Sequence, residues 1–120
     1  MKPHPIHKSF GFAFLGIYHA IKDSRNFRLQ AYIGAGAILA GKILEIDRFE
    51  MIIIFILVLL VLSAEMINSS IEAMTDLITN EHSMEARIAK DVAAGMVLVA
   101  SVGAAIVGAV IFIPYLLRLI

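Results

Sequence analysis

The chain has 120 residues, of which 60% are hydrophobic and only 17% charged, with no net charge at pH 7 and no cysteine. A soluble domain of this size lacks the interior volume to bury so much apolar surface, so residues 1–120 are predicted to form a single integral membrane domain. The zero net charge argues against nucleic acid as a partner, and the absence of cysteine excludes disulfides and thiolate metal sites.

The first predicted element is an amphipathic helix over about residues 8–24. Phe10, Phe14, Ile17 and Ile21 recur at helical spacing and define one apolar face. Apolar residues on the other side make the separation imperfect. A helix lying on the membrane surface fits this pattern better than a membrane span. A helix that packs on its neighbours is the alternative.

Three membrane spans are predicted to follow, over about residues 29–46, 51–78 and 91–117. The first is the weakest, because Gln30 and Lys42 lie near its ends. The second opens with fourteen residues that carry no formal charge and is longer than a bilayer requires, so its last turns should reach the headgroup region. The third is long enough to cross with some tilt.

The connections between these spans set the predicted orientation. A turn is expected at residues 45–50 and a loop at residues 79–90. Seven basic residues lie before the first span or in the second connection, against three on the opposite side. Because cytoplasmic segments are enriched in lysine and arginine, the N-terminus and the second connection are predicted to be cytoplasmic.

Small residues recur at four-residue spacing in the first and third spans, a pattern that lets membrane helices approach closely. Three spans are also few to enclose polar residues within one copy, so we expect a homo-oligomer. The alternative is that glycine and alanine are simply common in membrane spans. The repeats are Gly36/Ala40, Ala37/Gly41 and Ala100/Ala104/Gly108.

Four polar residues on the second predicted span form the candidate site: Glu65, Asn68, Glu72 and Asp76. At about 100° per residue they fall within one stripe roughly 80° wide. A carboxylate placed where a helix leaves the apolar zone is costly and usually has a partner or a function. A helix end emerging into water, the alternative, predicts scattered charges.

The stripe shares its predicted side of the membrane with residues 23–28 and 81–91. Together these segments hold carboxylates for a divalent cation, a lysine for phosphate charge and a further carboxylate for proton removal. Phosphoryl transfer needs these parts. By contrast, residues 36–43 only approach the phosphate-loop pattern G-x-x-x-x-G-K-[ST], because Ile43 replaces the Ser or Thr and no strand precedes it.

Residues 64–78, followed by Ala89-Lys-Asp-Val-Ala-Ala-Gly95, resemble the small bacterial membrane lipid kinases, namely the prokaryotic diacylglycerol kinases and the undecaprenol kinases. The Glu-x-x-Asn-x-x-x-Glu-x-x-x-Asp core carries most of this resemblance, which also includes Arg25-Asn-Phe27. It implies an all-α fold in the bacterial inner membrane, with a surface helix and three transmembrane helices. It also implies a homotrimer whose active sites are shared between subunits and face the cytoplasm.

The resemblance further implies roles for individual residues. Glu65 would be the catalytic base for a lipid hydroxyl, and Glu72 would hold Mg²⁺ and contact the nucleotide. Asn68 and Asp76 would order the site. The remaining contacts to ATP would come from Glu81, His82, Ser83, Lys90 and Asp91.

Two positions depart from the family pattern. The family usually has a metal-binding glutamate just before the Arg-Asn-Phe run, where this chain has Ser24, with Asp23 as a possible substitute one residue earlier. The family also usually has a histidine at the position of Ser83, and here His82 is displaced by one residue. The second metal ligand and the contacts of the nucleotide loop therefore remain open.

The segments Asp91-Val-Ala-Ala-Gly95 and Arg25-Asn-Phe27 are similar to the undecaprenol-type branch. The favoured function is therefore phosphorylation of undecaprenol by ATP and Mg²⁺, with diacylglycerol as the alternative substrate. An ion-coupled transporter or channel subunit is a rival from another class, but it needs polar residues on the third span, where Ser101 is the one candidate. A membrane scaffold with incidental charges is a third interpretation.

Overall fold

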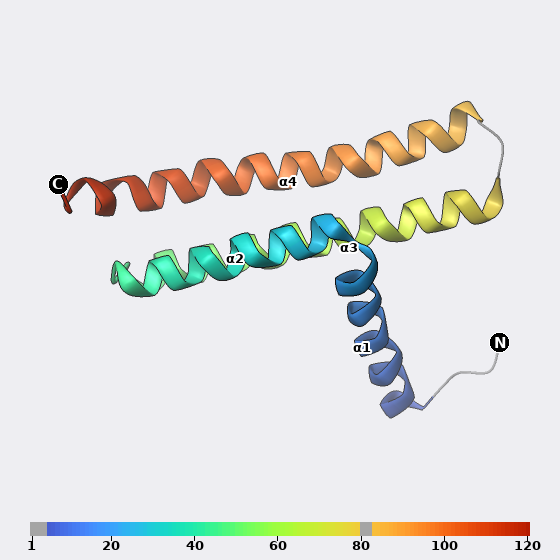
Figure 1. Cartoon of the computed structure of the whole chain (residues 1–120), viewed down its shortest axis with the longest axis horizontal. Coiled ribbons are helices and arrows are strands. Elements are labelled where there is room, and N and C mark those ends of the chain that lie inside the picture. Colours follow the sequence, from blue (N-terminus) through green and yellow to red (C-terminus); the bar gives the residue numbers. More distant parts are fainter. Residues whose placement is uncertain (1–4, 80–82) are drawn as a thin grey trace.

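The computed structural model describes residues 5–79 and 83–120, and in these ranges it forms four α-helices and no strand. α3 and α4 run antiparallel along the long axis of the molecule, α2 lies alongside α3, and α1 turns away from the bundle (Figure 1). The all-α prediction is therefore confirmed. The helices are α1 (Ile6–Asp23), α2 (Arg25–Ile43), α3 (Arg48–Ile78) and α4 (Met84–Leu117).

Ser24 separates α1 from α2. Its extended backbone ends the first helix, and its hydroxyl accepts a hydrogen bond from the Phe27 N–H (3.1 Å) at the start of the second. The Arg28 guanidinium donates to the carbonyl oxygens of Ile21 and Lys22, both at 2.8 Å. Because carbonyls at a helix C-terminus lack partners within the helix, these bonds fix the point at which α1 leaves α2.

α1 has no buried residue, although it carries several large apolar side chains. The Phe10 and Phe14 side chains, on the apolar face predicted from the sequence, are 63% and 70% exposed. The apolar face of α1 is thus not covered by the rest of the chain. The alternative of a helix packed on its neighbours within one chain is not observed.

The start of α4 differs from the sequence expectation. The Ser83 hydroxyl accepts a hydrogen bond from the Ala86 N–H at 3.0 Å, so the helix begins at Met84. The predicted loop over residues 79–90 is therefore wrong in its second half, because the N-cap at Ser83 starts the helix there. At the other connection, Asp47 and Glu50 form a reciprocal capping box that starts α3 at Arg48.

An apolar cluster joins α3, α4 and the turn after α2. Its buried members are Ile46, Ile54 and Ile111. A polar contact lies beside it, since the Tyr115 hydroxyl donates to the Glu50 carboxylate and accepts from the backbone N–H of Asp47. These contacts hold the N-terminal end of α3 against the C-terminal end of α4.

Among the described residues, α3 and α4 are the two helices long and apolar enough to cross a membrane, with 31 and 34 residues. α2 has 19 residues and carries Arg25, Arg28 and Lys42, which lower its hydropathy. Two of the three predicted spans therefore have the required length and composition. The third, in α2, stays a prediction.

Gly34 lies where α2 packs on α3, and this position yields a test of the helix packing. A Cβ added there would lie 2.6 Å from Val58 Cγ1, whereas a Cβ at Gly103 on α4 would meet nothing within 4 Å. Since Val58 is β-branched and stiff, Gly34→Ala is expected to lower the free energy of unfolding by about 1–3 kcal/mol. Gly103→Ala should raise it by up to about 1 kcal/mol through helix propensity.

Thermal unfolding in detergent, followed by circular dichroism, compares the two variants. Equal melting temperatures for Gly34→Ala and Gly103→Ala would contradict the close packing of α2 on α3.

Candidate active site

A cleft of about 690 Å³ lies where the end of α1 and the start of α2 meet the second half of α3. Its polar walls come from two regions far apart in the sequence, the α1–α2 junction and the polar stripe of α3. The structure thus brings all four stripe residues to one cavity, together with both candidates for the missing metal ligand. These lining residues are Asp23, Ser24, Glu65, Asn68, Glu72 and Asp76.

Glu65 and Asn68 are the two buried polar side chains in the described part of the chain, with exposed fractions of 3% and 6%. Glu65 Oε1 accepts a hydrogen bond from the Ser24 hydroxyl at 3.4 Å. Glu65 Oε2 and Asn68 Oδ1 are buried without a hydrogen-bond partner. Because such atoms cost free energy, a group that donates to them in the cleft would be bound favourably.

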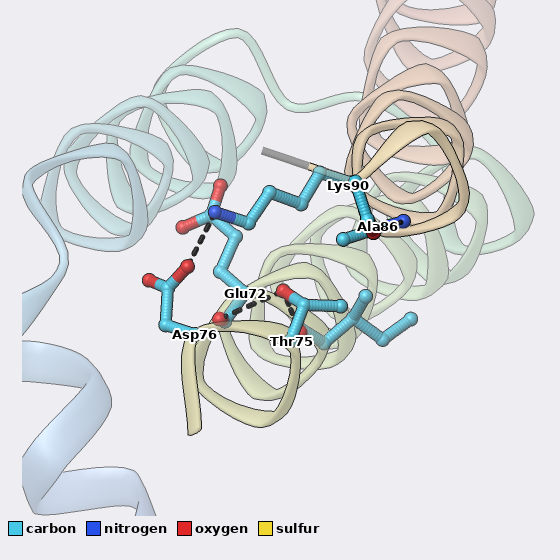
Figure 2. A network of polar contacts seen from close by, with 7 residues as sticks. Glu72, Thr75, Asp76, Ala86 and Lys90 are labelled. Atoms are coloured by element: carbon cyan, nitrogen blue, oxygen red, sulfur yellow. Dashed lines mark hydrogen bonds and ion pairs between the residues drawn. The ribbon is translucent and has the colours of Figure 1, made fainter. Parts of the chain in front are cut away.

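The ends of α3 and α4 are joined by an ion pair between Asp76 and Lys90. The Lys90 ammonium donates to Asp76 Oδ1, and its side chain extends from α4 toward the α3 residues Glu72 and Asp76 (Figure 2). Thr75, the residue before Asp76 on α3, instead donates to the backbone carbonyls of its own helix. The cation predicted to meet phosphate is therefore placed beside the last two carboxylates of the stripe.

Two other predicted nucleotide contacts, Ser83 and Asp91, do not line the cleft. Asp91 pairs with Arg87 at 4.0 Å on the surface of α4, and both side chains are well exposed. Ser83 serves as the N-cap of α4. Glu81 and His82 lie outside the described residues. Their predicted roles in binding ATP stay predictions.

The cleft has lining residues that sequence reasoning did not assign to the site. His19, Arg25 and Asn26 come from α1 and from the first turn of α2. His19 Nδ1 lies 3.7 Å from the Asp23 carboxylate, one helical turn away. The signal for Arg25 and Asn26 was present in the Arg-Asn-Phe segment, but the sequence alone does not show that this segment faces α3.

The carboxylates in the cleft can be compared with what magnesium requires. In the described residues, no three His, Cys, Asp or Glu side chains come close enough together to hold a metal ion. Proteins commonly hold Mg²⁺ through one or two carboxylates plus substrate phosphates, and the metal keeps several waters. Glu72 and Asp76, one turn apart on the cleft wall, fit that mode of binding. A complete protein cage for the metal is not present in the described chain.

Comparison with known families assigns this arrangement to a class of enzymes. The family described as prokaryotic diacylglycerol kinase matches residues 11–112. The chain belongs to the prokaryotic diacylglycerol kinase family. It is therefore a membrane lipid kinase that uses ATP, and the resemblance found in the sequence is confirmed. The transporter and scaffold interpretations are set aside.

Individual relatives carry the names of two different lipids. The chain is 39% identical over 109 residues to the undecaprenol kinase of Bacillus subtilis (strain 168), covering 91% of this chain and 89% of the relative. It is 36% identical over 112 residues to a diacylglycerol kinase of Synechocystis sp., covering 92% of this chain and 64% of that protein. Against the Escherichia coli (strain K12) diacylglycerol kinase, identity is 29% over 99 residues, or 82% and 81% of the chains.

The burial of Glu65 leads to a prediction on stability. Glu65→Gln keeps the shape of the side chain and removes a buried charge that has no cation beside it among the contacts described. We expect it to raise the free energy of unfolding by about 1–3 kcal/mol, because burying an unpaired charge costs more than burying a neutral amide. Glu85→Gln, at an exposed position in the first turn of α4, is the matched control and should change stability little.

Melting temperatures of the purified variants in detergent provide the measurement. A lower melting temperature for Glu65→Gln than for the wild type would show that the carboxylate stabilises the fold.

Proposed function

We propose that this kinase transfers the γ-phosphoryl group of ATP to the hydroxyl of undecaprenol, with diacylglycerol as the alternative acceptor. The observation that carries the proposal is the carboxylate of Glu65, which is buried on the cleft wall with Oε2 unpartnered. A general base needs an acceptor atom within hydrogen-bond reach of the substrate proton. Glu65 lines the cleft, and its Oε2 is an acceptor atom that no donor in the described chain occupies.

In the proposed reaction, the lipid hydroxyl donates a hydrogen bond to Glu65 Oε2 while its oxygen faces the γ-phosphorus of ATP. As the new oxygen–phosphorus bond forms, the bond to the leaving ADP breaks and the hydroxyl proton moves to Glu65. Asn68, one turn further along α3, orders the same wall with its buried amide. The proton then returns to water when the products leave.

The phosphate groups of ATP would lie near the far end of the stripe. Lys90 meets Asp76 there, and Glu72 lines the same wall. We propose that Glu72 holds magnesium and contacts the nucleotide, while Asp76 orders Lys90 toward the phosphates. When bound, magnesium would offset phosphate charge, which is the main demand of phosphoryl transfer. Ser83 and Asp91, near the N-terminal end of α4, would make further contacts with ATP.

The preference for undecaprenol rests on two similarities. The segments after Lys90 and around Asn26 are similar to the undecaprenol-type branch, and the relative named undecaprenol kinase shares 39% identity with the chain. The diacylglycerol kinase of Synechocystis sp. follows at 36%, so diacylglycerol is kept as the second candidate.

We further propose that α2 is the third membrane span, that α1 lies on the cytoplasmic surface, and that three copies assemble. Exposed Phe10 and Phe14 on α1 support a helix that contacts lipid. Of the small-residue repeats, Gly41 packs against Ile46 within the chain, whereas a Cβ added at Gly36 or Gly108 would meet nothing within 4 Å. Open glycine faces on two helices support contacts with another copy.

The lipid preference is tested by radiolabelled phosphate transfer from ATP into mixed micelles that contain either undecaprenol or diacylglycerol. We expect the larger kcat/KM with undecaprenol. Glu65→Gln should lower kcat by about 10²–10⁴-fold with either lipid, the usual contribution of a general base. A rate of Glu65→Gln within tenfold of the wild type would refute Glu65 as the base. A larger kcat/KM with diacylglycerol would make diacylglycerol the favoured acceptor.

The role of Lys90 is tested by Lys90→Gln. Its ion pair with Asp76 is partly exposed, at 40% and 66%, so its loss should change the free energy of unfolding by no more than about 1 kcal/mol. The kcat/KM for ATP should nevertheless fall at least about tenfold, because a cation at the phosphates is lost. Lys42→Gln, an exposed lysine in the last turn of α2, is the control and should keep the wild-type value. Equal effects of the two substitutions would mean that Lys90 has no specific role.

A further inference from the structure

We propose that Ser24 is a positioning residue for Glu65, and that its hydroxyl turns the carboxylate so that Oε2 faces the lipid hydroxyl. This inference rests on the proposed function of Glu65 as the general base. It gives position 24 a different task from the metal ligand that the family pattern suggests. Two hydrogen bonds made by the Ser24 hydroxyl support it.

The direction of the Ser24 hydroxyl is set by the start of α2. Its oxygen accepts from the Phe27 N–H at 3.1 Å, and its single proton points to Glu65 Oε1 at 3.4 Å. A serine hydroxyl has one proton to donate, so these bonds leave it no second donor for another group. The helix cap and the contact with Glu65 are therefore made by the same atom.

The junction that carries Ser24 is itself held in place. The backbone N–H of Ser24 bonds to the Ala20 carbonyl at 3.1 Å, and Arg28 closes the end of α1 with two further bonds. Phe27 is buried, with 6% of its surface exposed. A hydroxyl fixed on both sides in this way can hold a side chain that lies 41 residues further along the chain.

The two oxygens of Glu65 are not equivalent as a result. Oε1 is engaged by Ser24, and Oε2 is buried at the cleft without a partner. A base works best when a third group fixes its orientation and leaves the reacting atom free. One hydrogen bond to Oε1 restricts rotation of the carboxylate about its terminal bond, which would otherwise be broad. Ser24 thus supplies the orienting contact, and Oε2 remains for the proton.

A role as metal ligand fits position 24 less well. Ser24 is neutral, its hydroxyl is engaged with Phe27 and Glu65, and its contact on α3 is not Glu72. The neighbouring Asp23 faces His19 on α1. A glutamate at position 24 would bring a second negative charge against Glu65, whereas serine brings a donor. The hydroxyl and the carboxylate therefore complement each other.

Three substitutions separate the donated hydrogen bond from the helix cap. Ser24→Thr keeps both, Ser24→Asp keeps a cap of similar strength but cannot donate when ionised, and Ser24→Ala loses both. We expect Ser24→Ala and Ser24→Asp to lower kcat by about three- to tenfold, the value of an ordinary hydrogen bond, because 3.4 Å is long for a hydroxyl that donates to a carboxylate. Ser24→Thr should restore most of the rate. The KM values for ATP and for Mg²⁺ should stay within about twofold in all three, since the base and not the nucleotide site is affected.

Asp47→Ala is the matched control for the cap. It removes the N-cap of α3 at the opposite end of the helix, so it should lower the melting temperature and leave kcat unchanged. In the Glu65→Gln background, Ser24→Ala should have no further effect on the residual rate, because both changes act through one group.

Several results would overturn the proposal. A raised KM for Mg²⁺ with an unchanged kcat in Ser24→Ala would make Ser24 a metal ligand. If Ser24→Thr is as slow as Ser24→Ala, or if Ser24→Asp keeps the full kcat, the hydrogen bond donated by Ser24 does not contribute to kcat. If Glu65→Gln stays active, the proposed base fails and the positioning role fails with it. If Glu65→Gln is inactive while Ser24→Ala keeps its kcat, only the positioning role fails.

Discussion

The candidate site depends on keeping the Glu65 carboxylate buried within the long helix α3. Burial of a carboxylate without a cation beside it costs several kcal/mol in general, so the surrounding chain must supply hydrogen bonds or leave the cost in place. Here one oxygen is satisfied by Ser24 and the other is not. The fold keeps this residue although it lowers the stability of the protein, which is common for residues that take part in chemistry.

The α3–α4 helix pair is held by packing contacts at one end and carries part of the candidate site at the other. At one end, Tyr115 bridges to Glu50 and to the backbone of Asp47 beside the apolar cluster, which fixes how far α4 slides along α3. The same register then determines which residues face each other at the other end, where Lys90 meets Asp76. Both helices are continuous between these two contacts, so each contact restrains the same register. The exposed ion pair alone would be too weak to define it.

The sequence predicted what local patterns determine. The long apolar runs of α3 and α4 and the helical spacing of the polar stripe indicated helices with one polar face, and the structure has them. The N-cap at Ser83, a serine directly before the helix, is a local signal for the start of α4. The bond between Ser24 and Glu65 was different in kind, since it joins residues 41 positions apart and depends on how the α1–α2 junction packs against α3. The hydrophobic periodicity of neither segment predicts that contact. From the sequence alone, Ser24 is therefore only a departure from the family pattern, with no physical reason for it.

The contact at position 24 also bears on how metal would enter the site. With serine there, the wall around Glu65 carries one carboxylate fewer than a glutamate would give, and Glu72 and Asp76 lie further along α3 near Lys90. Like charges close to Glu65 would compete with it for any cation and oppose its ionised form. In the proposed mechanism, Glu65 takes the lipid proton, and Glu72, further along α3, holds the metal. Magnesium would then be held mainly by the phosphates it accompanies, which suits a cation that keeps most of its own waters.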